Sequence, residues 1–373
     1  MRNRFGVYLH VPFCLSKCPY CDFCSFPGSG DEDRERYVAA VIREIAERDY
    51  PNRPATSVFF GGGTPSLLSA GQFERLLSAV SEKHPLSGEA EITFEMNPAT
   101  ADREKLRALR SLGFNRVSIG CQSTNEEELK ALGRAHTAKG FFDAYEDVLA
   151  SGFGNVNVDL MYGIPAQTAD SFQKTLDAVL SLAPTHLSAY GLIIEEGTPF
   201  FERRDSLGLP GDDVEADLYA MAQKKLRDAG YVHYEISNYA RPGYECRHNL
   251  LYWREGDYAG YGLAAASHFG NVRTTNTRRM SSYLPAPAAA TEEKTVIEGA
   301  DAEYEYIMLA LRLSEGIDED VFRRRFGQYF KSKYEAKLAP FFARGLLVSD
   351  GKRTALTDEG LYLSSALLRE LLP

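Results

Sequence analysis

The chain has 373 residues, of which 44% are hydrophobic and 25% are charged, as in ordinary globular proteins. Its 42 Lys and Arg against 52 Asp and Glu give a net charge of -10, which argues against a general nucleic-acid or anionic-membrane surface. No stretch approaches the roughly 18 uninterrupted apolar residues of a membrane span, and the first residues lack the pattern of a signal peptide. We therefore expect a cytoplasmic protein that is not integral to a membrane.

Short β-rich runs alternate with longer helical patterns over residues 6–240. Strands are predicted at 6–11, 57–62, 91–96, 116–121, 155–163 and 186–194, and helices between them, for example at 34–48, 73–83 and 170–183. Strands separated by helices of this length indicate βαβ units and a parallel sheet. Six such units predict an α/β fold in which a partial (β/α)6 barrel is formed. An open doubly wound sheet also fits the periodicity.

The informative motifs follow the predicted strands. A cysteine cluster follows the first strand, GGGTP (61–65) the second, and Glu95, Gln122 and Asp159 lie at the third, fourth and fifth. In both candidate folds the carboxyl ends of parallel strands carry the functional residues. The motifs are therefore expected to meet at one end of the sheet.

The pattern changes after about residue 200. A helix is predicted at 212–230, a strand at 231–240, and a Pro/Ala-rich linker at 284–290. The last part is mostly helical, with two short β-like runs around SDGKR (349–353) that resemble a winged-helix layout. We expect a domain over 1–240, a middle segment and linker over 241–295, and a C-terminal, mainly helical winged-helix-like domain over 296–373. A stabilising cap is the favoured interpretation of that last domain, and DNA binding is the alternative.

Four of the six cysteines lie within residues 14–24. Clustered thiols in a reducing compartment more often hold a metal than form disulfides. A structural zinc site normally uses two CxxC-like pairs, which CLSKCPYC (14–21) does not provide. Three thiolates on one loop can instead hold three corners of a [4Fe–4S] cluster and leave one iron without a protein ligand. Cys24 is expected to be an inert thiol, and Cys121 and Cys246 to be packing residues, although Cys246 is an alternative thiolate ligand.

Cys14, Cys18, Tyr20 and Cys21 match CxxxCxΦC, so the chain resembles the radical S-adenosylmethionine (SAM) superfamily. The resemblance implies that Cys14, Cys18 and Cys21 bind a [4Fe–4S] cluster and that SAM chelates the open iron. It also implies that an electron from the cluster cleaves SAM to methionine and a 5′-deoxyadenosyl radical. The SAM contacts that it implies are Tyr8, Tyr20, Gly62, Gly63, Thr64, Glu95, Gln122, Arg134, Asp159 and Ile193.

Longer motifs narrow the resemblance to one branch of the superfamily. YLHVPFC, VFFGGGTPS, VNVDLMYGIPAQT and YEISNYARPG resemble the branch that contains oxygen-independent coproporphyrinogen III dehydrogenase (HemN) and the haem chaperones (HemW). The C-terminal region resembles the accessory domain of that branch. Phe23 stands where the dehydrogenase pattern has cysteine, only thirteen residues precede Cys14, and HNLLYW (248–253) matches the HNxxYW motif of the chaperones. These features place the chain closer to HemW.

The HNxxYW motif implies a haem site. His248, Tyr252 and Trp253 would supply an axial ligand and an apolar face, and Arg247 or Arg254 would bind the propionates. The alternative interpretation of His248 is a hydrogen-bonded histidine beside packed aromatic residues. The chain also departs from the chaperone pattern GxGxGAHS: it reads GYGLAAASH (260–268), so that position 266 is alanine and the histidine is His268. The role of that family histidine is then absent here or has moved.

Two functions follow from the resemblance. The first is a binding protein that carries haem to an acceptor, with a membrane-associated haem protein as the expected acceptor and an electron donor for the cluster. The second is coproporphyrinogen III dehydrogenase, which turns propionates into vinyl groups; a radical enzyme with an unrelated substrate is a third. The first is favoured, and whether the chain is itself an enzyme is left open.

Overall fold

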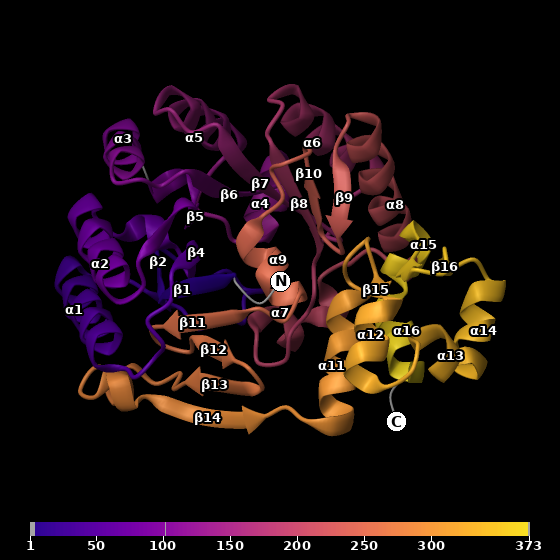
Figure 1. The fold of residues 1–373 in the computed structure, drawn as a ribbon. Helices are drawn as coiled ribbons and strands as arrows, with labels where there is room; N and C mark the ends of the chain where they lie inside the picture. Colours follow the sequence, from indigo (N-terminus) through magenta and orange to yellow (C-terminus); the bar gives the residue numbers. More distant parts are fainter. Residues whose placement is uncertain (1–3, 101, 372–373) are drawn as a thin grey trace.

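In the computed structural model, which describes residues 4–100 and 102–371, one large sheet contains twelve strands in the order β14-β13-β12-β11-β1-β4-β5-β6-β7-β8-β10-β9 (Figure 1). Six of them run parallel to their neighbours and form the centre of the sheet. These strands are β1 (Phe5–Val11), β4 (Ala55–Gly62), β5 (Leu86–Met96), β6 (Arg116–Gln122), β7 (Asn155–Tyr162) and β8 (His186–Gly191). The predicted partial (β/α)6 barrel and its six strands are thereby confirmed.

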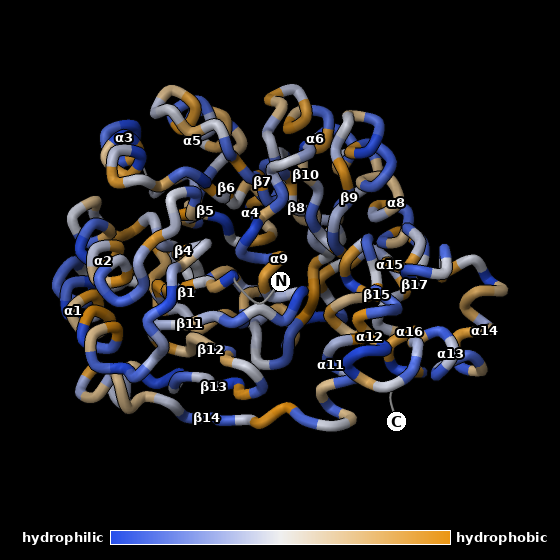
Figure 2. The backbone as a smooth tube through the Cα atoms, in the orientation of Figure 1, coloured by the Kyte–Doolittle hydropathy of each residue, from blue (hydrophilic) through white to orange (hydrophobic). Residues whose placement is uncertain are grey.

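An outer layer of helices covers the convex side of the central strands (Figure 1). Hydrophobic and hydrophilic positions recur in turn along these helices, which is the pattern of a helix with one buried face (Figure 2). In α2, for example, Phe73 packs its ring 5.2 Å from that of Phe60 on β4 and 5.3 Å from that of Phe114. The helices of this layer are α1 (Asp31–Glu47), α2 (Ala70–Lys83), α3 (Arg103–Ser111), α5 (Ala138–Ala150), α6 (Ala169–Ser181) and α8 (Asp212–Asp228). Two short helices, α4 (Glu126–Ala131) and α7 (Pro199–Glu202), follow β6 and β8.

Further strands, most of them antiparallel to their neighbours, extend the sheet at both edges. The run predicted as one strand at 231–240 is a hairpin of β9 (Val232–Glu235) and β10 (Asn238–Ala240), and β10 pairs with β8. At the other edge β11 (Asp257–Tyr261) pairs parallel with β1 and is followed by β12 (Ala266–Phe269), β13 (Val272–Asn276) and β14 (Thr291–Val296). The strands of the middle segment that we expected over 241–295 therefore belong to the same sheet as the barrel strands.

The Pro/Ala-rich stretch at 284–290 is packed against the barrel and is not a loose linker. Its Pro287 and Ala290 are buried, and Arg43 of α1 donates a hydrogen bond of 2.6 Å to the carbonyl of Leu284. The preceding short helix, α10 (Met280–Tyr283), is held by a bond of 2.6 Å from the Tyr283 hydroxyl to the Glu44 carboxylate. The Pro and Ala residues that suggested a linker instead form a tight turn beside α1.

A buried ion pair fixes this edge of the sheet. Glu44 and Arg48 of α1 form an ion pair of 2.8 Å, and Arg48 also donates to the side chain of Asn276 on β13 at 2.8 Å. The Glu44 carboxylate further accepts a bond of 2.7 Å from the backbone N–H of Gly262. Removing one partner of such a buried pair typically costs about 3–5 kcal/mol because the other charge is left uncompensated. The pair therefore holds β11–β13 in place against α1.

The C-terminal region has a hydrophobic core of its own, which includes Leu311, Phe322, Phe330 and Leu338. A three-stranded sheet in the order β15-β17-β16 packs among short helices, as the winged-helix-like prediction requires. The elements are α11 (Gly299–Ala310), β15 (Ile317–Asp318), α12 (Glu319–Phe326), α13 (Phe330–Lys333), α14 (Glu335–Ala343), β16 (Leu347–Ser349), β17 (Arg353–Leu356), α15 (Asp358–Tyr362) and α16 (Ser364–Leu371). No helix in the described ranges is long and apolar enough to cross a membrane.

Polar contacts join the C-terminal region to the barrel. The backbone N–H of Ile236 donates to the carbonyl of Arg312 at 2.9 Å. Arg273 of β13 forms two hydrogen bonds, of 2.7 and 3.0 Å, with the Glu305 carboxylate of α11. Helix α11 therefore lies against this edge of the sheet and forms one wall of a cavity beside it.

Candidate functional site

The cysteine loop follows β1 at the carboxyl end of the parallel strands. Two short strands, β2 (Phe13–Cys14) and β3 (Phe26–Pro27), pair with each other and close the loop at its base. Within the loop the backbone N–H of Cys21 donates to the carbonyl of Cys18 at 3.1 Å, which forms a turn. The thiols of Cys14, Cys18 and Cys21 are free and half-buried. The loop therefore holds three thiols close together and leaves them accessible.

A cavity of about 360 Å³ lies beside this loop and collects most of the predicted site residues. The residues of the predicted site that line it are Cys14, Cys18, Tyr20, Cys21, Gly62, Gly63, Thr64, Glu95, Gln122, Arg134 and Asp159. They come from the cysteine loop after β1, from β4, β5, β6 and β7, and from the segments that follow these strands, as expected for parallel strands whose carboxyl ends meet. Two predicted contacts lie elsewhere: Tyr8 borders neighbouring cavities, and Ile193, two residues beyond β8, is 68% exposed and does not line this cavity.

The sulfur atoms have hydrogen-bond donors of their own. The hydroxyl of Thr64 donates to Cys14 Sγ at 3.7 Å, and Nη1 of Arg134 donates to Cys18 Sγ at 3.8 Å. Both contacts hold these sulfurs in place as hydrogen-bond acceptors. Burial raises the pKa of the Cys21 thiol.

No group of three or more His, Cys, Asp or Glu side chains within residues 4–100 and 102–371 is arranged around the position of a single metal ion. The donor set, three thiols without a fourth on the loop's cavity side, fits a cluster with one open iron.

The GGGTP loop packs against the backbone of the cysteine loop. The N–H of Gly63 donates to the Val11 carbonyl at 2.9 Å, and the N–H of Thr64 donates to the Phe13 carbonyl at 2.7 Å. A Cβ on Gly63 would lie 2.6 Å from the Phe13 carbonyl oxygen, a distance that no real contact allows. The glycine is thus required by close approach to the chain itself as well as by its place on the cavity wall.

Two carboxylates, Glu95 on β5 and Asp159 on β7, face the same cavity. Glu95 accepts a hydrogen bond of 3.1 Å from the N–H of Gly62, and Asp159 accepts bonds from Ser118 at 3.0 Å and Asn157 at 2.7 Å. Burial, and then the nearby Asp159, raises the pKa of Glu95 to about 8. Burial also raises the pKa of Asp159. A cation or hydroxyl group of a ligand would relieve this unfavourable pairing of acids.

Gln122, at a bulge at the end of β6, and Arg134, which follows α4, both line the cavity. The register of β6 and β7 shifts between Gly120 and Gln122, and Gln122 has a φ of 67°. Arg134 donates through Nη2 to the Gly120 carbonyl at 2.8 Å, and its buried Nε has no partner in the described ranges. An arginine held in this way, with a donor left over, suits a carboxylate ligand.

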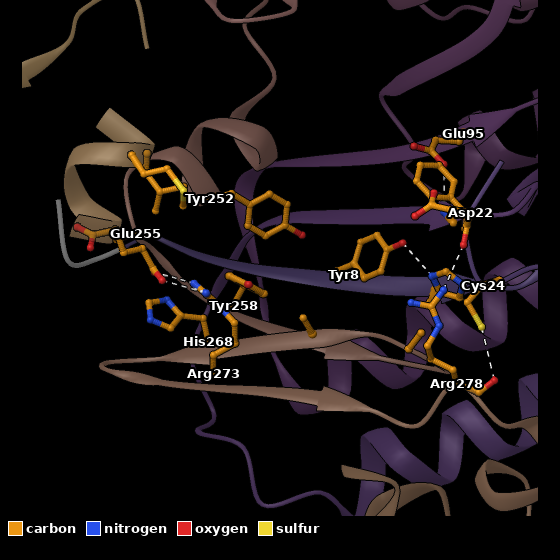
Figure 3. Close-up of a pocket in the computed structure, with 18 residues that line it drawn as sticks. Tyr8, Asp22, Cys24, Glu95, Tyr252, Glu255, Tyr258, His268, Arg273 and Arg278 are labelled. Atoms are coloured by element: carbon orange, nitrogen blue, oxygen red, sulfur yellow. Dashed lines mark hydrogen bonds and ion pairs between the residues drawn. The ribbon is translucent and has the colours of Figure 1, made fainter. Parts of the chain in front are cut away.

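A second, larger cavity of about 600 Å³ adjoins the first (Figure 3). Phe23, Gly62 and Glu95 line both cavities. Tyr8, Glu95, Asp22, Cys24 and Arg278 lie toward one end, and Tyr252, Glu255, Tyr258, His268 and Arg273 toward the other (Figure 3). The wall is completed by Met308 and Leu309 of α11. Sequence alone does not reveal this cavity, because its wall combines the middle segment over 241–295 with a helix of the C-terminal region.

The HNxxYW residues make up α9 (Arg247–Trp253) except for its first residue, and the helix packs against β1 and β4. His248 is only 1% exposed, and both of its ring nitrogens are engaged: Nδ1 with the Ser57 hydroxyl at 2.9 Å and Nε2 with the Tyr252 hydroxyl at 2.7 Å. Tyr252 reaches the larger cavity, whereas Trp253 packs with Tyr234 and Leu250. His248 thus has the hydrogen-bonded arrangement that the sequence analysis gave as its alternative, and its role as an iron ligand stays a prediction.

Comparisons with known proteins agree on a family. Residues 8–179 match the radical SAM superfamily, and residues 298–363 match the HemN C-terminal domain. A haem chaperone HemW of Mycobacterium tuberculosis is 38% identical over 379 residues, covering 99% of this chain and 95% of the relative. Another from Escherichia coli is 37% identical over 358 residues, covering 90% and 93%. The solved coproporphyrinogen III oxidase (HemN) of Escherichia coli superposes with a TM-score of 0.87 over 99% of this chain and 90% of that one; at 24% identity this shows a shared fold.

Proposed function

The chain belongs to the HemW family of radical SAM proteins, and on that premise we propose that it binds haem and delivers it to acceptor proteins while carrying a [4Fe–4S] cluster and SAM. Family membership implies the cluster and SAM. Within the structure, one observation carries the proposal: the cavity of about 360 Å³ beside the three cysteines shares Phe23, Gly62 and Glu95 with a cavity of about 600 Å³. A cofactor and a larger cargo can therefore be held side by side.

Cys14, Cys18 and Cys21 would hold the cluster, which when bound supplies an open iron for SAM and single electrons for its cleavage. Thr64 and Arg134 donate hydrogen bonds to two of the sulfurs, those of Cys14 and Cys18, at 3.7 and 3.8 Å. The β2–β3 ladder closes the loop and keeps the three thiols on one side of it.

The remaining residues of the smaller cavity suit SAM. Arg134 would bind its carboxylate, and Glu95 and Asp159 would accept from its ammonium or ribose hydroxyl groups. Tyr20 offers an apolar face for the adenine, and Gln122 an amide at the end of β6. Tyr8 and Ile193 would contact SAM only where the bound molecule extends beyond this cavity.

Haem requires an apolar space, an iron ligand and cations for its propionates. The larger cavity supplies apolar side chains such as Phe23, Met308 and Leu309, and it is lined by two arginines, Arg273 and Arg278. Its volume lies within the range of about 300–1,000 Å³ of small-molecule sites. The acceptor would be a haem protein at a membrane, an electron donor would reduce the cluster, and the cytoplasm is the expected location.

The test uses the full chain, reconstituted anaerobically with iron and sulfide. Haem is titrated in and followed by its Soret band, and the loaded protein is then mixed with membrane vesicles that contain a haem-depleted respiratory enzyme. We expect stoichiometric binding followed by recovery of the respiratory enzyme, and a haem-free preparation is the control. A parallel incubation with SAM, a reductant and coproporphyrinogen III should give no protoporphyrinogen. Failure to retain haem, or turnover of coproporphyrinogen, would refute the proposal.

A further inference from the structure

The larger cavity contains one histidine whose ring is free to bind a metal. Among the seven histidines, all of which lie in the described ranges, His268 is the one whose ring nitrogens form no hydrogen bond. The other histidine on the cavity wall, His10, is engaged through both nitrogens, with the Tyr8 hydroxyl at 3.0 Å and the Cys24 carbonyl at 2.8 Å. A neutral imidazole binds iron through an uncommitted nitrogen lone pair. His268 meets that requirement, and His10 and His248 do not.

The register of the sheet places His268 in the cavity. His268 lies on β12 opposite Tyr258 of β11 and Arg273 of β13, and directly opposite residues of an antiparallel pair share a face. All three line the cavity, and Figure 3 shows them together at one end. Ala266, two residues before His268 on the same face, also lines it, so the wall beside the imidazole carries only a methyl group. His268 is 5% exposed, which shields the ring from bulk water.

Of the two arginines that line the larger cavity, Arg278 is the one available to an anionic ligand. Arg273 is paired with Glu305 at 2.7 Å, and Glu255 is paired with Arg325. Arg278 donates to the backbone carbonyl of Asp22 at 3.1 Å but has no carboxylate partner within residues 4–100 and 102–371. In Figure 3 Arg278 lies toward the end of the cavity opposite His268. A planar ligand with a metal at its centre and carboxylates on its edge matches this arrangement.

We infer that haem binds in the larger cavity with His268 as an axial ligand of its iron and Arg278 paired with a propionate. This inference rests on the proposed haem-chaperone function and assigns its site. It places the cargo against Phe23, Gly62 and Glu95, the wall shared with the cavity beside the cluster cysteines. It also assigns the role of iron ligand to His268 on β12, and not to His248 of the HNxxYW motif.

The first experiment compares His268→Ala with His248→Gln in the reconstituted full chain. Ferric haem is added, and the electron paramagnetic resonance and resonance Raman spectra report the axial ligand. We expect the histidine signature in the wild type and in His248→Gln, and its loss in His268→Ala. Added imidazole should restore it in His268→Ala, which a misfolded variant would not show. The signature persisting in His268→Ala and vanishing in His248→Gln would overturn the assignment while leaving the haem-chaperone function intact. Absence of haem binding in the wild type would overturn both.

The second experiment tests the propionate contact with a matched pair of arginines. Arg278→Gln removes the cation on the wall, whereas Arg279→Gln removes its neighbour, which pairs with Glu292 and does not line the cavity. We expect Arg278→Gln to weaken haem affinity about tenfold or more, and Arg279→Gln to leave it unchanged. Haem dimethyl ester, which lacks the carboxylates, should bind both variants and the wild type alike. Equal affinity of the two variants for haem would contradict the contact.

Discussion

Arg134 donates a hydrogen bond to the sulfur of Cys18 at 3.8 Å across a separation of 116 residues in the chain. The same guanidinium donates to the carbonyl of Gly120, so the end of β6 and the cysteine loop are held by one side chain. The contact links the residues expected to bind the cluster to those expected to bind SAM. We therefore expect this single cation to couple the two cofactors.

Replacing Arg134 should weaken SAM binding and disturb the cluster. We predict that Arg134→Gln lowers the affinity for SAM about ten- to hundred-fold, since a charge-assisted contact to its carboxylate is lost. Equilibrium dialysis with labelled SAM measures the affinity, and the visible spectrum reports the cluster. Arg107→Gln, at an exposed position of α3 outside the cavity, is the control and should behave like the wild type. Equal losses in both variants would argue against the role of Arg134.

The cysteines should divide into two classes. We expect Cys14→Ala, Cys18→Ala and Cys21→Ala each to prevent assembly of the cluster, measured as iron and acid-labile sulfide per chain. Cys24→Ala should keep the full content, because Cys24 faces the larger cavity, where its thiol donates to the Arg278 carbonyl at 3.7 Å. Loss of iron in Cys24→Ala equal to that in Cys18→Ala would show that the ligand set is assigned incorrectly.

Binding of SAM should depend on pH through Glu95. The pKa of this carboxyl is about 8 in the ligand-free protein, so below pH 8 it mostly carries a proton. The positive charge of SAM favours the carboxylate, so the pKa falls on binding and a proton is released. The affinity should therefore rise with pH up to about 8, by at most tenfold per pH unit, and then level off.

Calorimetry in buffers of different ionisation enthalpy measures that proton release. Glu95→Gln should remove both the release and the dependence on pH. Glu89→Gln, at an exposed position on the same strand, is the control and should retain them. A wild-type affinity that is constant between pH 6 and 8 would contradict the ionisation of Glu95.

Adding one methyl group to the GGGTP loop should damage the site. In Gly63→Ala the new Cβ would lie 2.6 Å from the Phe13 carbonyl oxygen, so the loop must shift away from the cysteine loop. We predict a loss of about 1–3 kcal/mol in the free energy of unfolding, together with poor retention of the cluster. Gly71→Ala in α2, where a Cβ meets nothing within 4 Å, should instead be neutral or slightly stabilising. Denaturant unfolding compares the two, and equal stabilities would refute the packing argument.

The central strands could be predicted because each is a short run that is buried on both faces and is followed by an amphipathic helix. The smaller cavity followed from that prediction, since parallel strands bring Glu95, Gln122 and Asp159 to one end. Ile193 shows the limit of the argument: it follows the last parallel strand as required, yet its side chain is exposed in the ligand-free protein.

The larger cavity could not be predicted in the same way. Its wall depends on the pairing of β11 with β1, two segments about 250 residues apart, and on α11 from the C-terminal region. The stretch at 284–290 has the composition of a linker, and only its burial against α1 shows otherwise. His268 is conspicuous for its unbonded ring, a property of the folded environment that the sequence does not contain.

The most direct test of the cofactor site is the electron paramagnetic resonance spectrum of the reduced cluster with and without SAM. If Cys14, Cys18 and Cys21 leave one iron open, SAM should shift the spectrum, and ¹⁵N in its amino group should show hyperfine coupling to the cluster. Cys24→Ala should give the same result. A spectrum that SAM does not change in the wild type would contradict an open iron and with it the arrangement proposed for the two adjoining cavities.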